Sequence, residues 1–161
     1  MKQMRIGIFG DAHIPDRAFE IPDLIKKELY ACDMILCTGD LTGEEVVEFV
    51  KNSGKPHKMV RGNMDHLDLP KLESIDIEGK KIVIIHSDEV KPRGDRDKLF
   101  AIAERYNADI LLYGHTHEQD VWELNGKIFV NPGSATGLGP DGNPHCAIIE
   151  MGKNSLSVKK T

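Results

Sequence analysis

The chain has 161 residues, of which 40% are hydrophobic and 29% are charged, a balance typical of one folded domain. Its formal net charge is −5, and its lysines and arginines are scattered, which disfavours a nucleic-acid-binding face. No apolar run is long enough to predict a membrane span. The three cysteines, Cys32, Cys37 and Cys146, form no CxxC pair, so we expect a reducing compartment, the cytoplasm.

Strands are predicted first along the chain. Five short apolar runs rich in isoleucine and valine cover Met4–Phe9, Met34–Cys37, Lys58–Val60, Ile82–Ile85 and Ile110–Tyr113. Helical patterns lie between them. Ile21, Ile25 and Leu29 follow helical spacing after the first strand. Thr42 and Glu45 predict a capping box for a second helix.

A third helix is expected from Asp97 to Tyr106, and the last third of the chain reads as strands joined by turns. These strands are Val121–Leu124, Lys127–Val130, Cys146–Met151 and Ser155–Lys159, with a hairpin signal at Asn125 and Gly126. The alternating units predict a largely parallel sheet, and the hairpins predict antiparallel additions to it or a second sheet packed against it. We expect residues 1–161 to form a single domain.

Potential metal ligands follow all five strands of the first two thirds, in the stretches GDAH, TGD, RGNMD, IIHSD and GHTH. The residues are Asp11, His13, Asp40, Asn63, His86, His115 and His117. Because the carboxyl ends of parallel strands lie along one edge of a sheet, we expect these side chains to converge. Two carboxylates, an amide and four imidazoles exceed the ligands of one tetrahedral zinc ion, but they fit two ions sharing a bridging carboxylate.

The chemistry of this set favours Mn²⁺, Fe²⁺, Zn²⁺ or Ni²⁺, since it mixes nitrogen and oxygen atoms without thiolates. Glycines come directly before a ligand at Gly10, Gly39, Gly62 and Gly114, where we expect the chain to turn sharply. Each motif alone has a simpler interpretation, as a turn, a helix cap or a pair of loop histidines. The metal hypothesis depends on all five motifs occurring in order at strand ends.

This ordered series resembles the calcineurin-like metallophosphoesterase superfamily, and in length it is similar to the small single-domain phosphodiesterases of bacteria and archaea. The stretch NPGS at Asn131 to Ser134 adds to the likeness. The resemblance implies an α/β fold, a four-layer α/β/β/α sandwich of two mixed sheets flanked by helices. It also implies two divalent ions, with Mn²⁺ expected and Ni²⁺, Fe²⁺ or Zn²⁺ as alternatives.

The resemblance assigns ligands to each ion. One would be held by Asp11, His13, Asp40 and His117, and the other by Asp40, Asn63, His86 and His115. Asp40 would bridge the ions, and Asp40, Asn63 and His115 are the residues it assigns to catalysis. A hydroxide shared by the ions would then attack a phosphodiester in line.

Two positions depart from the family pattern. Met64 stands where many members have a histidine that protonates the leaving group, and His66 is either a substitute or a surface histidine. Asp88 stands where the phosphodiesterase branch has a second histidine, so it would either hydrogen-bond a ligand imidazole or repel a phosphate. Arg93 and Arg96 are candidates to reach substrate oxygens, with a solvated loop as the alternative.

The sequence therefore predicts a metal-dependent phosphodiesterase acting on a small or nucleotide-like phosphodiester. The oligomeric state stays open at this point, with a homodimer as one candidate, because family members often form dimers. The alternative is a non-catalytic metal-binding scaffold or interaction module. The retromer complex contains a subunit of this family with a degenerate metal site, so fold alone does not establish catalysis.

Overall fold

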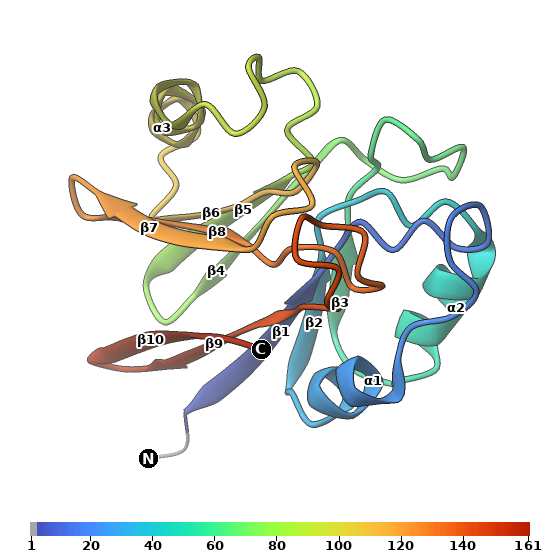
Figure 1. The fold of residues 1–161 in the computed structure, drawn as a ribbon. Helices are drawn as coiled ribbons and strands as arrows, with labels where there is room; N and C mark the ends of the chain where they lie inside the picture. The colour runs from blue at the N-terminus through green and yellow to red at the C-terminus, as the bar shows by residue number, and fades with distance from the viewer. Residues whose placement is uncertain (1–2) are drawn as a thin grey trace.

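The computed structural model describes residues 3–161, in which ten strands form two five-stranded sheets (Figure 1). The first sheet has the order β10-β9-β1-β2-β3. Its strands are β1 (Met4–Phe9), β2 (Met34–Cys37), β3 (His57–Met59), β9 (Ala147–Gly152) and β10 (Ser155–Lys160). The second sheet has the order β4-β5-β6-β8-β7. Its strands are β4 (Leu72–Ile77), β5 (Lys80–Ile85), β6 (Ile110–Leu112), β7 (Asp120–Leu124) and β8 (Lys127–Asn131).

Both sheets are mixed. Strands β1, β2 and β3 run parallel, with β9 antiparallel to β1 and β10 antiparallel to β9. Strands β5, β6 and β8 also run parallel, with β4 and β7 added antiparallel at the two edges. The two predicted C-terminal hairpins therefore belong to different sheets. Strands β7 and β8 are part of the second sheet, and strands β9 and β10 are part of the first.

Three helices cover the outer faces: α1 (Asp23–Tyr30), α2 (Glu44–Lys51) and α3 (Arg96–Arg105). Helices α1 and α2 lie on the side of β1, β2 and β3, and α3 lies on the far side of the second sheet (Figure 1). Three apolar clusters fill the spaces between these layers. Ile8, Leu36 and Ile84 pack between the sheets, whereas Ile35 packs under α1 and α2, and Leu111 packs under α3.

The alternation of neighbouring residues explains this layering. Ile35 and Leu36 are adjacent on β2 yet belong to different clusters, because successive side chains of a strand point to opposite faces. Both faces of the central strands are covered, so these strands are apolar throughout. The predicted four-layer α/β/β/α sandwich of two mixed sheets is confirmed.

The structure corrects the sequence interpretation at two elements. Helix α2 begins after Gly43 with no side-chain cap, so the predicted capping box is wrong. Thr42 instead donates its hydroxyl to the carbonyl of Ile14 at 2.7 Å. Strand β4 was not predicted. Its inward-facing Glu73 breaks the apolar alternation and forms a 3.4 Å salt bridge with Lys58.

The three cysteines form no disulfide bond with one another. Cys32, Cys37 and Cys146 are all buried free thiols. Among residues 3–161, no helix has the length and apolar character needed to cross a bilayer. The cytoplasmic location stays a prediction.

Candidate metal centre

The structure brings all seven predicted ligands together where the carboxyl ends of the parallel strands of both sheets meet. Asp11 and His13 follow β1, while Asp40 and Asn63 follow β2 and β3. The other three come from the second sheet: His86 follows β5, and His115 and His117 follow β6. The sequence predicted one shared edge. The structure instead divides the ligands between two sheets, whose strand ends converge across the inter-sheet core.

A first group contains Asp11, His13, Asp40 and His117, whose potential ligand atoms all lie within 4.8 Å of one another. Nε2 of His13 lies 3.5 Å from Oδ2 of Asp40 and 3.2 Å from Nε2 of His117. Oδ1 of Asp11 is buried and has no hydrogen-bond partner among the described residues. A buried carboxylate oxygen without a donor is costly, and a cation at this point would satisfy it.

A second group shares Asp40 and adds His86 and His115, again with ligand atoms within 4.8 Å of one another. Nε2 of His86 lies 3.1 Å from Oδ2 of Asp40 and 3.3 Å from Nδ1 of His115. Oδ1 of Asn63 lies 3.0 Å from the same His86 nitrogen. The two groups correspond to the two ligand sets that the family resemblance implies, and Asp40 belongs to both.

Backbone carbonyls orient two of the imidazoles. Nδ1 of His86 lies 2.9 Å from the carbonyl oxygen of Thr38, and Nδ1 of His117 lies 3.4 Å from that of Leu138. A carbonyl oxygen only accepts hydrogen bonds, so in both rings Nδ1 carries the proton. When the ring is neutral, Nε2 then presents its lone pair to the centre, as metal binding requires.

Burial and charge adjust the protonation of these groups. Burial lowers the pKa of His13 to about 4 and also lowers the pKa of His115 and of His117, which favours neutral rings. Burial raises the pKa of Asp11 to about 7. Burial disfavours the charged forms of Asp40 and His86, since it tends to raise the pKa of the aspartate and to lower the pKa of the histidine. The hydrogen bond between them nevertheless lowers the pKa of Asp40 and raises that of His86 to about 9.

The sharp turns at the centre are made by the ligands themselves. Asp11, His13, Asp40, His115 and His117 all have positive φ angles, between 50° and 75°. Non-glycine residues rarely adopt this region, and such strain concentrates at functional sites. Of the preceding glycines only Gly39 has a positive φ, of 104°. At Gly10 and Gly114 the sharp turn falls on the ligand that follows the glycine rather than on the glycine itself. At Gly62 the reason is space, since a Cβ atom there would overlap the carboxylate of Asp40.

Asp65 fixes the position of two ligand loops without belonging to either metal group. Its buried carboxylate accepts backbone N–H bonds from Asp40 and Gly62 at 2.9 Å each, and from Thr42 at 2.6 Å. Sequence analysis assigned no separate role to this residue. Its place in the Gly-Asn-x-Asp motif was the one available signal.

The segment that begins with the NPGS stretch forms hydrogen bonds to the loops that carry the candidate ligands. Sequence reasoning missed this role. Asn131 donates to the hydroxyl of Thr116 at 2.8 Å and accepts from Gly133 N–H at 2.9 Å, which fixes the Gly-His-Thr-His loop. Ser134 donates to the carbonyl of Asp11 at 2.8 Å. Both are buried polar residues, so their hydrogen bonds shape the backbone around the ligands.

The remaining charged candidates have separate positions. Arg93 and Asp88 line a cavity that also borders Asn63 and His115. Arg96 points elsewhere: it forms a 3.1 Å salt bridge with Asp120 and lies 4.7 Å from the ring centroid of Trp122. Arg96 therefore does not line the cavity beside His115, and of the two candidate arginines only Arg93 does.

Three further residues lie in the loops around the centre: Met64, His66 and Arg17. The backbone N–H of Met64 donates to Asp40 Oδ1 at 2.9 Å, while its side chain is 49% exposed and cannot transfer a proton. His66 is exposed and does not line the cavity beside His115. Arg17 was not predicted. Its charge contributes, after burial, to the low pKa of His13 and of His117.

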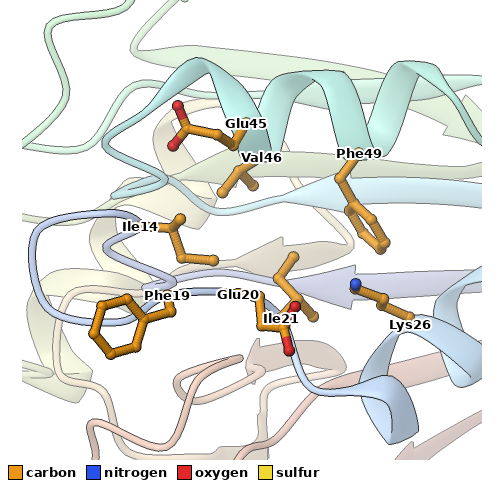
Figure 2. Close-up of a pocket in the computed structure, with 8 residues that line it drawn as sticks. All are labelled: Ile14, Phe19, Glu20, Ile21, Lys26, Glu45, Val46 and Phe49. Carbon is orange, nitrogen blue, oxygen red and sulfur yellow. The ribbon is translucent and has the colours of Figure 1, made fainter.

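A separate apolar cavity of about 160 Å³ lies between the loop after β1 and helices α1 and α2 (Figure 2). Ile14, Ile21 and Phe49 contribute to its lining, together with two carboxylates and the single lysine, Lys26. A cavity with an excess of negative charge disfavours a phosphate ester, so we assign the chemistry to the metal centre.

A four-layer α/β fold with aspartates and histidines gathered at strand ends defines the class of metal-dependent phosphoesterases. The family model for the calcineurin-like phosphoesterase superfamily domain matches residues 4–154, and the chain belongs to this superfamily.

Relatives of the chain include proteins from archaea and structures from eukaryotes. A probable metallophosphoesterase of Methanocaldococcus jannaschii is 38% identical over 97% of this chain and 78% of its own length. A second, from Methanothermobacter thermautotrophicus, is 38% identical over 83% of this chain and 78% of its own.

Two solved structures of vacuolar protein sorting 29 have the same fold. The one from Cryptosporidium parvum gives a TM-score of 0.86 at 30% identity and covers 100% of this chain and 98% of that one. The one from Entamoeba histolytica, complexed with Zn²⁺, gives 0.86 at 32% identity and covers 98% of this chain and 97% of that one.

Proposed function

We propose that this chain is a metal-dependent phosphodiesterase, and that Asp11, His13, Asp40, Asn63, His86, His115 and His117 hold two divalent ions. The observation that carries the proposal is the sharing of Asp40 between two complete groups of ligand atoms. Nitrogen and oxygen ligands without thiolates suit Mn²⁺, with Ni²⁺, Fe²⁺ and Zn²⁺ as the other candidates. When bound, such a pair lowers the pKa of an attacking water and stabilises charge on a phosphoryl oxygen.

The residues of the chain prepare the site for this chemistry. Asp40 belongs to both groups, and two hydrogen bonds fix it in place. The backbone N–H of Met64 donates to its carboxylate, and its own backbone N–H donates to the carboxylate of Asp65. The neutral imidazoles of His13, His115 and His117 present lone pairs without adding positive charge. Asn63 and His115 also border the adjoining cavity, where they can position a phosphoryl oxygen of the substrate.

The cavities beside the centre favour a diester over a monoester. One cavity, of about 520 Å³, borders His115, and another, of about 210 Å³, borders His117. A phosphodiester carries an ester group on each side of phosphorus, and each group can enter one of these spaces. Met64 offers no proton to a leaving group, which favours substrates whose leaving group is already a weak base.

The experiment is to strip the protein with a chelator, restore Mn²⁺ alone, and measure hydrolysis of bis-p-nitrophenyl phosphate and p-nitrophenyl phosphate. We expect metal-dependent turnover that favours the diester. Asp40→Asn should lose both turnover and bound metal, whereas the exposed Asp76→Asn variant should keep both. Undiminished turnover by Asp40→Asn would exclude the proposed centre.

The second candidate is a non-catalytic scaffold, which the likeness of the whole fold to vacuolar protein sorting 29 supports. One such structure is a complex with a cyclic peptide. In that case metal would bind and no ester of either kind would be hydrolysed. A homodimer, predicted from the edge strands of the C-terminal hairpins, stays a prediction that sedimentation can test.

A further inference from the structure

The cavity beside His115 has a wall of its own, built by the loop between β5 and α3. Asp88, Val90, Lys91, Pro92 and Arg93 line it on this side, opposite Asn63 and His115. Its volume of about 520 Å³ exceeds the space that a phosphoryl group alone requires. The wall is therefore in a position to contact a part of the substrate beyond the scissile phosphate.

The backbone of this wall is anchored to the metal centre, while the side chains of Lys91, Pro92 and Arg93 are exposed to solvent. Val90 is buried, and its N–H donates to the carbonyl of Ser87 at 3.1 Å. The hydroxyl of Ser87 donates at 3.1 Å to the carbonyl of Gly114, the residue before His115. Asp95 N–H closes the loop by donating to the carbonyl of Pro92 at 3.1 Å. These contacts hold the backbone of the loop beside His115, and the exposed side chain of Arg93 lines the cavity from this loop.

Arg93 is a cation without a protein partner. Across residues 3–161 no carboxylate forms a salt bridge with it, whereas the nearby Arg96 is held by Asp120 at 3.1 Å. Lys91 contributes a second positive charge to the same cavity, and the two outnumber the single carboxylate of Asp88. An unpaired guanidinium in a fixed wall is suited to bidentate binding of an anion, and phosphate is the anion it matches best.

We propose that this cavity binds a second phosphate carried by the substrate, and that Arg93 is the residue that recognises it. The inference rests on the proposed phosphodiesterase function and narrows its substrate class. The substrate would be a phosphodiester, such as an oligonucleotide fragment or a phosphorylated nucleotide ester, with an additional phosphate on one of its two ester groups. The chain has a net charge of −5, so this local positive charge is what attracts an anionic group.

The experiment compares three substrates that share one internal phosphodiester. They are thymidylyl-thymidine, the same dinucleotide with a 5′-terminal phosphate, and the same dinucleotide with a 3′-terminal phosphate. Cleavage of the internal diester by the Mn²⁺-loaded protein is followed by chromatography for wild type, Arg93→Gln and Arg96→Gln. The Arg96 variant is the matched control, because it removes an equal charge three positions away and outside the cavity.

We expect wild type to have a higher kcat/KM for at least one phosphorylated dinucleotide than for the unphosphorylated one. Arg93→Gln should reduce this preference by roughly 10- to 100-fold, as expected for a lost charge-assisted hydrogen bond. Arg96→Gln should keep the preference. Equal kcat/KM for all three substrates in wild type, or an unchanged preference in Arg93→Gln, would overturn the inference while leaving the phosphodiesterase proposal intact.

A binding measurement tests the role of Arg93 even if the protein has no phosphodiesterase activity on these substrates. If wild type cleaves none of the three, the phosphodiesterase proposal fails for this substrate class, and titration calorimetry with the same Mn²⁺-loaded proteins decides on Arg93. Tighter binding of a phosphorylated dinucleotide that is lost in Arg93→Gln and kept in Arg96→Gln would support the phosphate site. Indistinguishable affinities for the three dinucleotides would refute it.

Discussion

The Oδ2 atom of Asp65 accepts a hydrogen bond of 2.9 Å from the backbone N–H of Asp40, so one buried carboxylate fixes the chain at the residue shared by both metal groups. The same carboxylate also accepts from Gly62 and Thr42. It thereby joins the loops after β2 and β3, each of which supplies a ligand. Asp65 is a positioning residue, since its oxygens are already taken by backbone donors.

Replacing Asp65, whose carboxylate clamps the two loops, should lower both the stability of the protein and its affinity for metal. Asp65→Ala leaves three backbone N–H groups without their acceptor, and we expect the free energy of unfolding to fall by about 2–3 kcal/mol. Metal affinity should fall as well, because Asp40 is no longer held in place. Denaturant unfolding and metal titration measure the two effects. The exposed Asp68→Ala variant is the control, and an equal response of both variants would contradict the clamp.

A second prediction concerns Asn131, which lies far from the ligands in sequence. Asn131→Ala removes the hydrogen bonds to the hydroxyl of Thr116 and from the N–H of Gly133. We expect a loss of about 1–3 kcal/mol in the free energy of unfolding, since the asparagine is buried. His115 and His117 flank Thr116, so metal affinity should weaken too. Unchanged affinity in a destabilised Asn131→Ala protein would show that the loop is positioned without it.

The gathering of the seven candidate ligands was predictable from sequence because each one follows a strand, where turn residues mark the boundary and the chain must leave the sheet. The alternation of strands and helices predicted parallel α/β units with added hairpins, and the family resemblance supplied the four-layer sandwich. What the sequence did not show is how the ligands divide between two sheets, since strand order is decided by pairings such as that of Ile6 with Ile149, distant in the chain.

The supporting residues escaped prediction for a related reason. Asp65 accepts from a backbone N–H of another loop and Asn131 donates to a backbone carbonyl of another loop, and such backbone groups leave no mark in the sequence. Strand β4 escaped because an inward glutamate, Glu73, is compensated by Lys58 from the other sheet. Arg93 and Arg96 are three positions apart and chemically identical. Their surroundings differ in the structure, because Arg96 pairs with Asp120 whereas Arg93 lines the cavity beside His115.

Metal removal should lower the thermal stability of the protein. Without metal, the centre has two buried carboxylates, and Oδ1 of Asp11 has no hydrogen-bond partner within the described part of the chain. Ions that bind only the folded state stabilise the protein against unfolding. At a free Mn²⁺ concentration about 100 times Kd, the gain is about 2.7 kcal/mol. This corresponds to a rise of roughly 5–10 °C in Tm for a domain of this size. Scanning calorimetry of chelated and Mn²⁺-loaded protein measures it, and Asp40→Asn should show a much smaller rise.

Asp141 and His145 should give the protein a pH-dependent stability near neutrality. Nε2 of His145 lies 2.7 Å from Oδ2 of Asp141, and Nδ1 lies 2.9 Å from the carbonyl oxygen of Thr161. Burial opposes protonation, but the bond to Asp141 outweighs it and raises the pKa of His145. The backbone N–H of Asn143, and then His145, lower the pKa of Asp141, so this carboxylate stays ionised through the neutral range.

The direction of the effect follows from the raised pKa of His145. A histidine whose pKa is higher in the folded than in the unfolded state contributes stability that is complete below its unfolded pKa, about 6.5, and is lost as pH rises through the folded value. Asp141→Asn should remove this contribution and lower the pKa of His145. Wild type should therefore exceed the variant in Tm by more at about pH 6 than at about pH 8.5, where the ring is increasingly neutral in both. Titration of His145 by NMR tests the cause directly, and an equal pKa in both proteins would contradict the pairing.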